Sequence, residues 1–201
     1  MHSFSIQWNI LSQALCFLFL QILFSNCDPN GEHNHILSVD TIHCRVHELS
    51  DFELRKEFSS HKFSLKAALS YEIGIALFRK KVCWLNGPFP AAVNDITIYR
   101  QALMDKIPIG KKVIADRMYM SEASPGDTIS CRNRFDTPEV KEFKKRGRAR
   151  HETFNAGIKK FACMREWRHE FEKHVIAFEA IIVVLQCNLD CGDELFNLLE
   201  D

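Results

Sequence analysis

The stretch Ile36-Leu-Ser-Val-Asp-Thr-Ile-His-Cys-Arg-Val46 decides the fold of this chain. Residues that favour β-structure alternate in it with polar residues, as in a strand that buries one face. Ala68 to Phe78 and Lys81 to Leu85 repeat the pattern, so the sequence predicts three strands in succession. Asp40 lies in the middle of the first strand, and strands are usually depleted of aspartate. It is therefore a candidate for a functional role.

The segment after the third strand is expected to hold a helix and a fourth strand. Asn86-Gly87-Pro88 is a turn-forming sequence that we expect to end the third strand. Asn94 or Asp95 is expected to cap a helix that runs through Leu103. Val113-Ile-Ala-Asp116 then predicts a fourth strand, with a second aspartate at its end.

Two long helices are expected in the C-terminal part of the chain. Thr137 as N-cap and Pro138 at the first position predict a helix that extends to about Phe161. A last helix is predicted over residues 169–189, and because residues 175–185 are apolar on nearly all sides, we expect it to be buried. The resulting order, β-β-β-α-β-α-α, predicts an α/β fold in which helices pack on the faces of a mixed sheet.

Residues 1–35 are expected to lie outside the folded domain, which comprises residues 36–201. Segment 8–24 is apolar, like the core of a secretion signal, but no Lys or Arg precedes it and no small-residue cleavage site follows it. A helix that covers the domain fits this segment as well as a secretion signal does, and both interpretations stay open. Residues 28–35 are polar and rich in turn formers, which is typical of a linker.

Composition excludes few functional classes. The chain has 26 basic and 26 acidic side chains, so its net charge of zero gives no sign of a strongly charged partner. Its eight cysteines are scattered through apolar segments and form no CxxC pair, and we expect them to be reduced thiols. Cys187 and Cys191 form a single CxxxC pair, which we interpret as small buried side chains rather than half of a zinc site.

Three acidic residues are expected to meet at one edge of the predicted sheet. Adjacent strands lie about 4.8 Å apart, so pairing of the first strand with the fourth would bring Asp40 and Asp116 together. Two carboxylates that close repel each other unless a cation lies between them. Glu152 lies on the helix expected to return across the same end of the sheet. Divalent ions held by such carboxylates are what phosphodiester cleavage requires.

Several segments of the chain occur in the order in which one known family has them. They are Val39-Asp40-Thr-Ile-His-Cys-Arg45, Ser60-His61-Lys62-Phe63, Tyr71-Glu72-Ile-Gly74, Trp84-Leu-Asn-Gly-Pro-Phe-Pro90 with Asn94-Asp95, Ile114-Ala-Asp116-Arg-Met-Tyr119, Arg150-His151-Glu152-Thr-Phe-Asn155, Arg168-His169, Phe178-Glu179-Ala180 and Leu195-Phe196. Over residues 36–199 the chain thereby resembles the DDE superfamily endonuclease domain of Harbinger-type transposases.

The resemblance implies a ribonuclease-H-like fold, with a mixed sheet of three antiparallel strands plus parallel strands, flanked by helices. It also implies that Asp40, Asp116 and Glu152 form a catalytic triad that binds a divalent metal, Mg²⁺ or Mn²⁺. The expected activity is cleavage of DNA phosphodiester bonds, with strand transfer to a new site, in the nucleus. No helix-turn-helix module is evident in the sequence, so a separate DNA-binding partner protein is expected.

Three positions depart from the family pattern, which usually has glycine where this chain has Thr41, Ala92 and Met118. Glycine permits a positive φ or a close approach of backbone to a ligand, and a side chain forfeits both. We expect the fold to survive these changes and the site to be distorted. A catalytically inactive descendant that binds DNA or protein is therefore the alternative to an active nuclease.

Basic residues around Glu152 are expected to contact the phosphates of DNA. On its helix they are Lys144, Lys145, Arg146, Arg148 and Arg150. His61 and Lys62 are candidates to reach the scissile phosphate, and a turn with no binding role is an equal alternative. Asp95 is better explained as a carboxylate that stabilises the start of its helix. His151 lies about 100° around the helix from Glu152 and is expected to support the site from outside at most.

Overall fold

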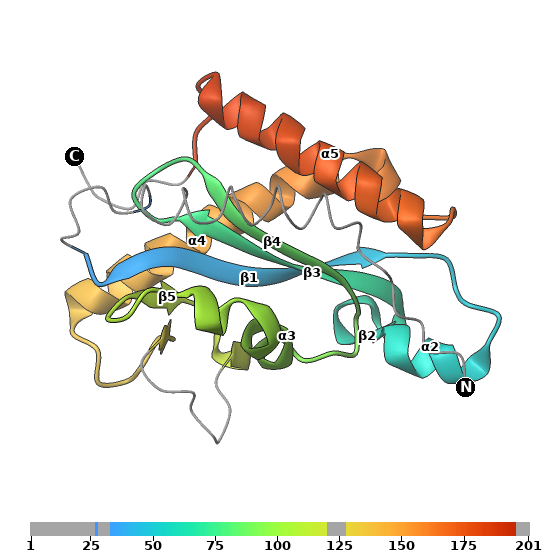
Figure 1. Ribbon diagram of the computed structural model, residues 1–201, viewed down its shortest axis with the longest axis horizontal. Coiled ribbons are helices and arrows are strands. Elements are labelled where there is room, and N and C mark those ends of the chain that lie inside the picture. The colour runs from blue at the N-terminus through green and yellow to red at the C-terminus, as the bar shows by residue number, and fades with distance from the viewer. Residues whose placement is uncertain (1–26, 28–32, 120–127, 196–201) are drawn as a thin grey trace.

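Three long antiparallel strands carry the sheet. The computed structural model of the chain describes residues 27, 33–119 and 128–195. β1 (His35–Arg45) pairs antiparallel with β3 (Lys66–Ala76), and β3 pairs antiparallel with β4 (Val82–Pro90). The three strands predicted from the alternation of residues are therefore confirmed, and they cross the centre of the molecule (Figure 1).

Two short strands extend the sheet on the other side of β1. β5 (Lys112–Ile114) pairs parallel with β1, and β6 (Ile129–Ser130) pairs parallel with β5. The order across the sheet is β4-β3-β1-β5-β6, with β2 (Ser59–Ser60) also attached to β3. The predicted mixed sheet is thus confirmed, and so is the pairing of the first predicted strand with the fourth. β5 ends at Ile114, two residues before the predicted end at Asp116.

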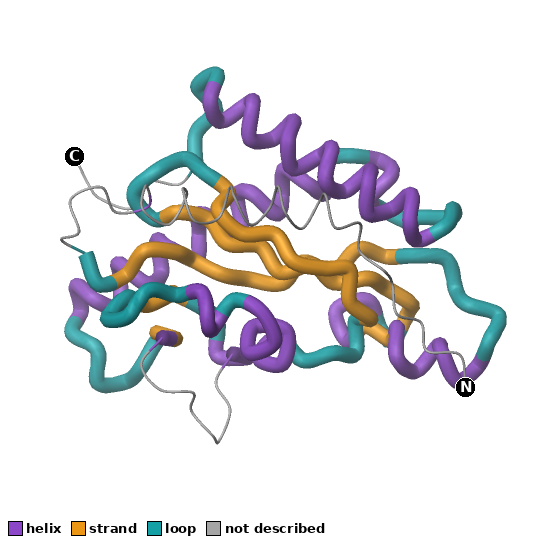
Figure 2. Tube along the Cα trace, viewed as in Figure 1, coloured by secondary structure: helices purple, strands orange, loops and turns teal. Residues whose placement is uncertain are grey.

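Helices cover both faces of the sheet (Figure 1). α3 (Asp95–Ala102) packs on one face, whereas α4 (Pro138–Lys160) and α5 (Phe171–Asp190) pack on the other. The core cluster on the α4 and α5 face includes Ile42, Ile73, Phe154 and Phe178. The cluster on the α3 face includes Val39, Ile96, Tyr99 and Val113. Figure 2 shows the same layers, with strands in orange between helices in purple.

The sequence Asn86-Gly87-Pro88 does not end a strand, contrary to the prediction. β4 continues through it, and a register shift against β3 falls between Ser70 and Glu72. Gly87 has a φ of +138°, and a Cβ there would lie 2.8 Å from Cδ1 of Tyr71 and 2.9 Å from the carbonyl oxygen of Ser70. The tripeptide therefore forms a bulge inside the strand, at a position that requires glycine.

α5 is buried on one face only, so the expectation of a wholly buried helix is wrong. His174, Phe178 and Ile182 are buried. Ile176 and Val183 are 67% and 61% exposed, respectively. Figure 1 shows α5 at the upper edge of the fold, where only one of its faces has sheet and helix to pack against.

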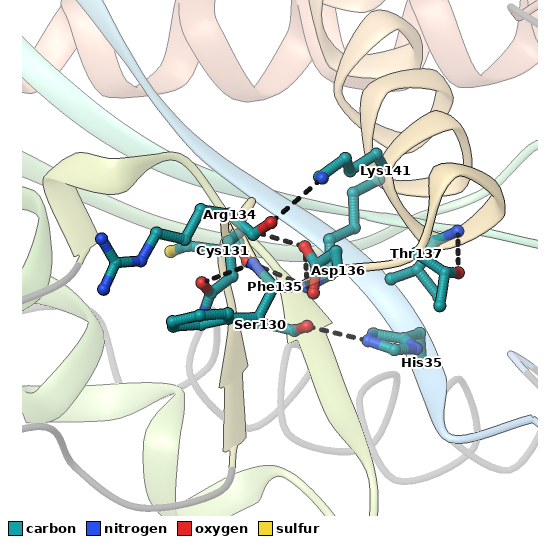
Figure 3. A network of polar contacts seen from close by, with 11 residues as sticks. His35, Ser130, Cys131, Arg134, Phe135, Asp136, Thr137 and Lys141 are labelled. Atoms are coloured by element: carbon teal, nitrogen blue, oxygen red, sulfur yellow. Dashed lines mark hydrogen bonds and ion pairs between the residues drawn. The ribbon is translucent and has the colours of Figure 1, made fainter.

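Polar contacts set the start of α4 (Figure 3). The side chain of Thr137 accepts a hydrogen bond from the backbone N–H of Val140, which confirms the predicted N-cap. Nε2 of His35 in β1 lies 2.9 Å from Oγ of Ser130 in β6. This side-chain contact joins β6, the strand that precedes α4, to β1. These contacts determine where α4 begins and hence which of its later residues reach the sheet.

A short helix, α2 (Phe52–Phe58), and the 3-10 turn η1 (His61–Phe63) are not predicted from the sequence. Asp51 caps α2 by accepting a hydrogen bond from the backbone N–H of Glu53 at 2.9 Å. No residue of α2 is buried, so it has no apolar face whose spacing would indicate a helix.

The apolar segment 8–24 lies outside the described residues. In the part that is described, no helix is long and apolar enough to cross a membrane. The expectation of reduced thiols is confirmed for the described cysteines, of which the buried ones are Cys27, Cys44, Cys83 and Cys131. Cys187 and Cys191 are exposed, so the interpretation of this pair as buried side chains is wrong. Cys163 is also exposed.

Candidate functional site

A pocket opens where β1 and β5 separate. The parallel pairing of the two strands ends at Ser38 and Ile114. Two residues further along come Asp40, which is still paired with Ile73 of β3, and Asp116, which lies beyond the end of β5. Residues two apart on a strand share a face, so the ends of this ladder direct both carboxylates to one side of the sheet.

α4 closes the pocket over the two aspartates and adds the third acid. The residues that line the pocket are Val39, Asp40, Asp116, Arg148, His151 and Glu152. Its volume is about 30 Å³, which is room for about two water-sized ligands. Asp40 and Asp116 are half-buried, and Glu152 is exposed. The structure thus brings together the three acids that the sequence singled out.

His151 joins α4 to β1 beside these acids. Its ring is buried, and burial lowers the pKa of the imidazole, which keeps the ring neutral near physiological pH. Nε2 lies 2.6 Å from the carbonyl oxygen of Ser38. Because a carbonyl oxygen can only accept, Nε2 carries the proton and donates it. His151 therefore lines the pocket directly, which is a closer involvement than we expected from its place on the helix.

Each aspartate has a polar partner within the protein. Oδ2 of Asp116 lies 3.1 Å from Nη2 of Arg148. Nδ2 of Asn155 donates a hydrogen bond to Oδ2 of Asp40 at 3.2 Å. Sequence reasoning did not assign Asn155 to the site. Its spacing of three residues after Glu152 and seven after Arg148 places all three on one helix face, and this signal would have identified it.

The three acids share a pocket without converging on one point. Across residues 27, 33–119 and 128–195, no group of three or more His, Cys, Asp or Glu side chains is close enough together to hold a metal ion. The partners of the two aspartates account for this arrangement. Arg148 neutralises Asp116 with a charge-assisted contact, and the amide of Asn155 satisfies one oxygen of Asp40.

A fourth acid, Asp95, lies close to the pocket from the α3 side. Burial raises the pKa of its carboxyl, and the charges of Asp40 and Asp116 raise it further. Lys62 and a hydrogen bond with Thr41 act in the opposite direction. Asp95 is the first residue of α3, which suits the helix-stabilising role that we expected. The influence of Asp40 and Asp116 on its pKa places Asp95 within electrostatic reach of both aspartates.

Two of the basic residues expected to contact DNA are buried, and for them the prediction is wrong. Lys144 and Arg150 are each 5% exposed. Nζ of Lys144 lies 3.0 Å from Oδ2 of Asp136. Arg150 donates hydrogen bonds to the carbonyl oxygens of Ala76 and Arg79. Both side chains lie on the face of α4 that packs on the sheet, where a DNA phosphate has no access.

Four other predicted phosphate contacts lie outside the pocket. Lys145 and Arg146 share one acidic partner, Glu142, at 3.1 Å and 3.4 Å. Lys145 keeps 67% of its side chain exposed. His61 and Lys62 are exposed on η1. A role in phosphate binding stays a prediction for these four residues.

The three positions at which a side chain was expected to distort the site accommodate one. Thr41 is buried, and its hydroxyl lies 2.8 Å from the hydroxyl of Tyr119. Ala92 and Met118 are exposed. None of the three has a positive φ. The backbone at these positions therefore needs no positive φ and suits a residue with a side chain, and the effect of the three side chains on ligand approach stays a prediction.

Comparison of the chain with protein-family models, with curated proteins and with solved structures found no match. The motifs of the sequence and the geometry of the pocket are therefore the features that indicate a function.

Proposed function

We propose that the chain contains a ribonuclease-H-like nuclease domain of the Harbinger transposase type, which binds Mg²⁺ or Mn²⁺ and cleaves DNA phosphodiester bonds. One observation carries the proposal: Asp40, Asp116 and Glu152 line a single pocket. The three come from a strand, the segment just after another strand and a late helix. Their meeting depends on the tertiary fold, since none is a neighbour of another along the chain.

The sheet supports the fold part of this proposal. β4, β3 and β1 are antiparallel neighbours, and β5 and β6 continue the sheet in parallel with β1. A ribonuclease-H-like domain has this combination of three antiparallel strands plus parallel strands, with helices on both faces. The pocket lies at the junction of the two halves of the sheet, where β1 continues and β5 has ended.

The donor set of the pocket fits divalent ions. Carboxylate oxygens are hard ligands of the kind that Mg²⁺ and Mn²⁺ prefer. When bound, such ions would supply an activated nucleophile and would stabilise the leaving oxygen. Asn155 engages Oδ2 of Asp40, so the other oxygen of this carboxylate can ligate an ion, whereas the contact of Arg148 with Asp116 would compete with one. Glu152 would turn inward to complete the set of ligands. Glu152 is exposed and has room to do so.

The other residues of the domain have supporting parts in this proposal. Asp40 is held in place by the pairing of β1 with β3. His151 sets the distance between α4 and β1 and thereby the position of Glu152. Lys62 donates a hydrogen bond from Nζ to the carbonyl oxygen of Thr41 at 2.8 Å, and Lys145 pairs with Glu142 outside the pocket. The positive charge of both residues suits attraction of the DNA backbone.

Strand transfer to a new DNA site, a separate DNA-binding partner protein and a nuclear location belong to the same proposal. The location is tested by imaging the full-length chain with a C-terminal tag. Nuclear signal supports the proposal. Signal in the secretory pathway contradicts it and identifies segment 8–24 as a secretion signal.

A catalytically inactive descendant that binds DNA or protein is the second candidate. The contact between Arg148 and Asp116 favours it, because the guanidinium group neutralises one carboxylate of the pocket without a metal ion.

Calorimetric titration with Mn²⁺, followed by incubation with plasmid DNA, separates the two candidates. An active nuclease is expected to bind Mn²⁺ and to cut the plasmid. Asp116→Asn keeps the shape of the side chain and removes its charge, so we expect it to weaken Mn²⁺ binding at least about tenfold. Glu142→Gln, an exposed acid on the same helix, is the matched control and should bind like the parent. Binding without cleavage favours the inactive descendant, and absence of Mn²⁺ binding both with and without a DNA duplex rejects the nuclease.

A further inference from the structure

Arg148 differs from the other cations of α4 in its position. It is the one basic residue among the six that line the pocket, since His151 is neutral. Its Nη2 lies 3.1 Å from Oδ2 of Asp116, and it precedes Glu152 by one helical turn. Lys144 is held by contacts inside the protein, and Arg146 pairs with Glu142, which is not a pocket residue.

The guanidinium of Arg148 and a divalent ion compete for the negative charge of the Asp116 carboxylate. Both are cations, and they repel each other when they contact the same group. The ion-pair contact with Arg148 therefore weakens the binding of an ion at Oδ2 of Asp116, and movement of the guanidinium away from Oδ2 strengthens it. The structure permits this displacement, because 41% of the Arg148 side chain and 38% of the Asp116 side chain are exposed to solvent.

A displaced guanidinium needs a new anion, and a phosphodiester group is well suited to be one. Arginine binds phosphate through two parallel N–H donors in a planar fork. Arg148 lines the pocket, and 41% of its side chain is exposed to solvent, so a phosphodiester group has access to it. A DNA phosphate at that place would draw the guanidinium off Asp116 and leave the carboxylate free for the metal ion.

We propose that Arg148 is an internal competitor of the divalent ion at Asp116 and that a DNA phosphate relieves this competition. Metal binding and DNA binding would then strengthen each other, and the coupling is reciprocal by thermodynamic linkage. Without DNA, the guanidinium keeps Asp116 neutralised and metal binding weak. This inference rests on the proposed function, because it assigns a substrate-dependent step to the same site.

The test is calorimetric titration of the full chain with Mn²⁺, with and without a saturating short DNA duplex whose integrity is checked afterwards on a gel. Arg148→Gln removes the competitor. We expect the variant to bind Mn²⁺ about fivefold more tightly than the parent when DNA is absent, which is what the loss of a half-exposed ion pair allows. In the parent, DNA is expected to tighten Mn²⁺ binding by a similar factor. In Arg148→Gln, DNA should leave Mn²⁺ affinity unchanged.

Lys160→Gln is the matched control, because it removes the same charge from an exposed position on the same helix, away from the pocket. It should behave like the parent, which separates competition at Asp116 from a general effect of charge. Far-ultraviolet circular dichroism checks that each variant is folded. Arg148→Met, which keeps the aliphatic stem, is a second variant from which the same result is expected.

Each outcome decides the inference. If the parent binds Mn²⁺ and both Arg148 variants bind it equally or more weakly, the inference is overturned and the proposed function stands. Persistence of the DNA effect in the variants also overturns it. If the Arg148 variants bind Mn²⁺ and the parent does not bind it in the absence of DNA, the result supports competition at Asp116. It also shows that the parent binds no metal ion until DNA is present. If no protein binds Mn²⁺ under any condition, the proposed function and this inference both fail.

Discussion

Nε2 of His151 lies 2.6 Å from the carbonyl oxygen of Ser38 and donates a hydrogen bond to it, across the interface between α4 and β1. Ser38 stands two residues before Asp40, and Glu152 follows His151 directly. Ser38 and His151 are both buried, so water does not replace the hydrogen bond between them if it is lost. A neutral imidazole therefore helps to fix the distance between the strand that carries one acid and the helix that carries another, together with the hydrogen bond from Asn155 to Asp40.

Substitution of His151 tests this dependence. His151→Ala should lower the free energy of unfolding by about 3 kcal/mol, because it leaves a cavity and an unsatisfied buried carbonyl group. Urea denaturation measures the change. Thr153→Ala, at an exposed position on the same helix, should change the free energy by less than about 0.5 kcal/mol. An equally small loss in His151→Ala would show that the contact does not hold α4 in place.

Glu72 predicts an unusual dependence of stability on pH. Its carboxyl is fully buried, and burial raises its pKa to about 8, although Nε1 of Trp84 donates a hydrogen bond to Oε2 at 2.7 Å. The folded protein therefore binds a proton that the unfolded chain releases at lower pH. Linkage then requires stability to fall as pH rises from about 4.5 to about 8, by at most about 1.4 kcal/mol for each unit.

Glu72→Gln removes this titration and keeps an acceptor for Trp84. Near pH 4.5 the variant and the parent should unfold at similar urea concentrations, and the variant should become progressively more stable than the parent as the pH approaches about 8. Parallel stability curves over this range would contradict the raised pKa.

Gly74 is expected to tolerate no side chain. It pairs with Trp84 across β3 and β4, and a Cβ at Gly74 would lie 2.8 Å from Cβ of Trp84. Neither atom is the end of a flexible chain, so Gly74→Ala should destabilise the protein by about 1–3 kcal/mol in a thermal or urea melt. Gly157→Ala is the comparison, because its nearest neighbour is a Leu185 methyl at 3.2 Å. We expect it to cost far less, since the added helix propensity offsets the contact.

Thiol labelling tests the burial pattern. Under native conditions, iodoacetamide should modify the exposed Cys163, Cys187 and Cys191 well before Cys44, Cys83 and Cys131. Burial raises the pKa of Cys44 to about 12 and that of Cys131 to about 11, so both also lack the reactive thiolate. Peptide mass spectrometry over a time course gives the order. Rapid labelling of Cys44 would be incompatible with its place between the sheet and α4.

Local signals in the sequence were sufficient for most of the sheet. Alternation of residues predicted β1, β3 and the start of β4, and an aspartate in the middle of such a strand marked the site. Thr137 predicted the start of α4 because an N-cap acts within one turn of helix. The residue pattern of β1 or of β5 does not indicate which strand it pairs with. Their pairing was predicted because it would bring the carboxylates of Asp40 and Asp116 together around a metal ion.

The predictions that the structure contradicts failed because they depend on contacts between segments that are distant in the sequence. The burial of Lys144 depends on Asp136 and the carbonyl oxygen of Cys131, which a run of basic residues does not reveal. The continuation of β4 through Gly87 depends on the fit of its backbone against Tyr71 of the neighbouring strand. The exposed face of α5 follows from its place at the edge of the fold, whereas its composition alone suggests burial on all sides.

The early end of β5 gives the two aspartates different mechanical support. Asp40 is anchored in register with Ile73, so its position moves only if the sheet moves. Asp116 follows the last paired residue of β5, Ile114, on backbone that belongs to a connecting segment. The gap between the two carboxylates, and with it the radius of the ion that they would select, therefore depends on how the residues after β5 are held, and Cys131 and Arg148 contact Asp116 there.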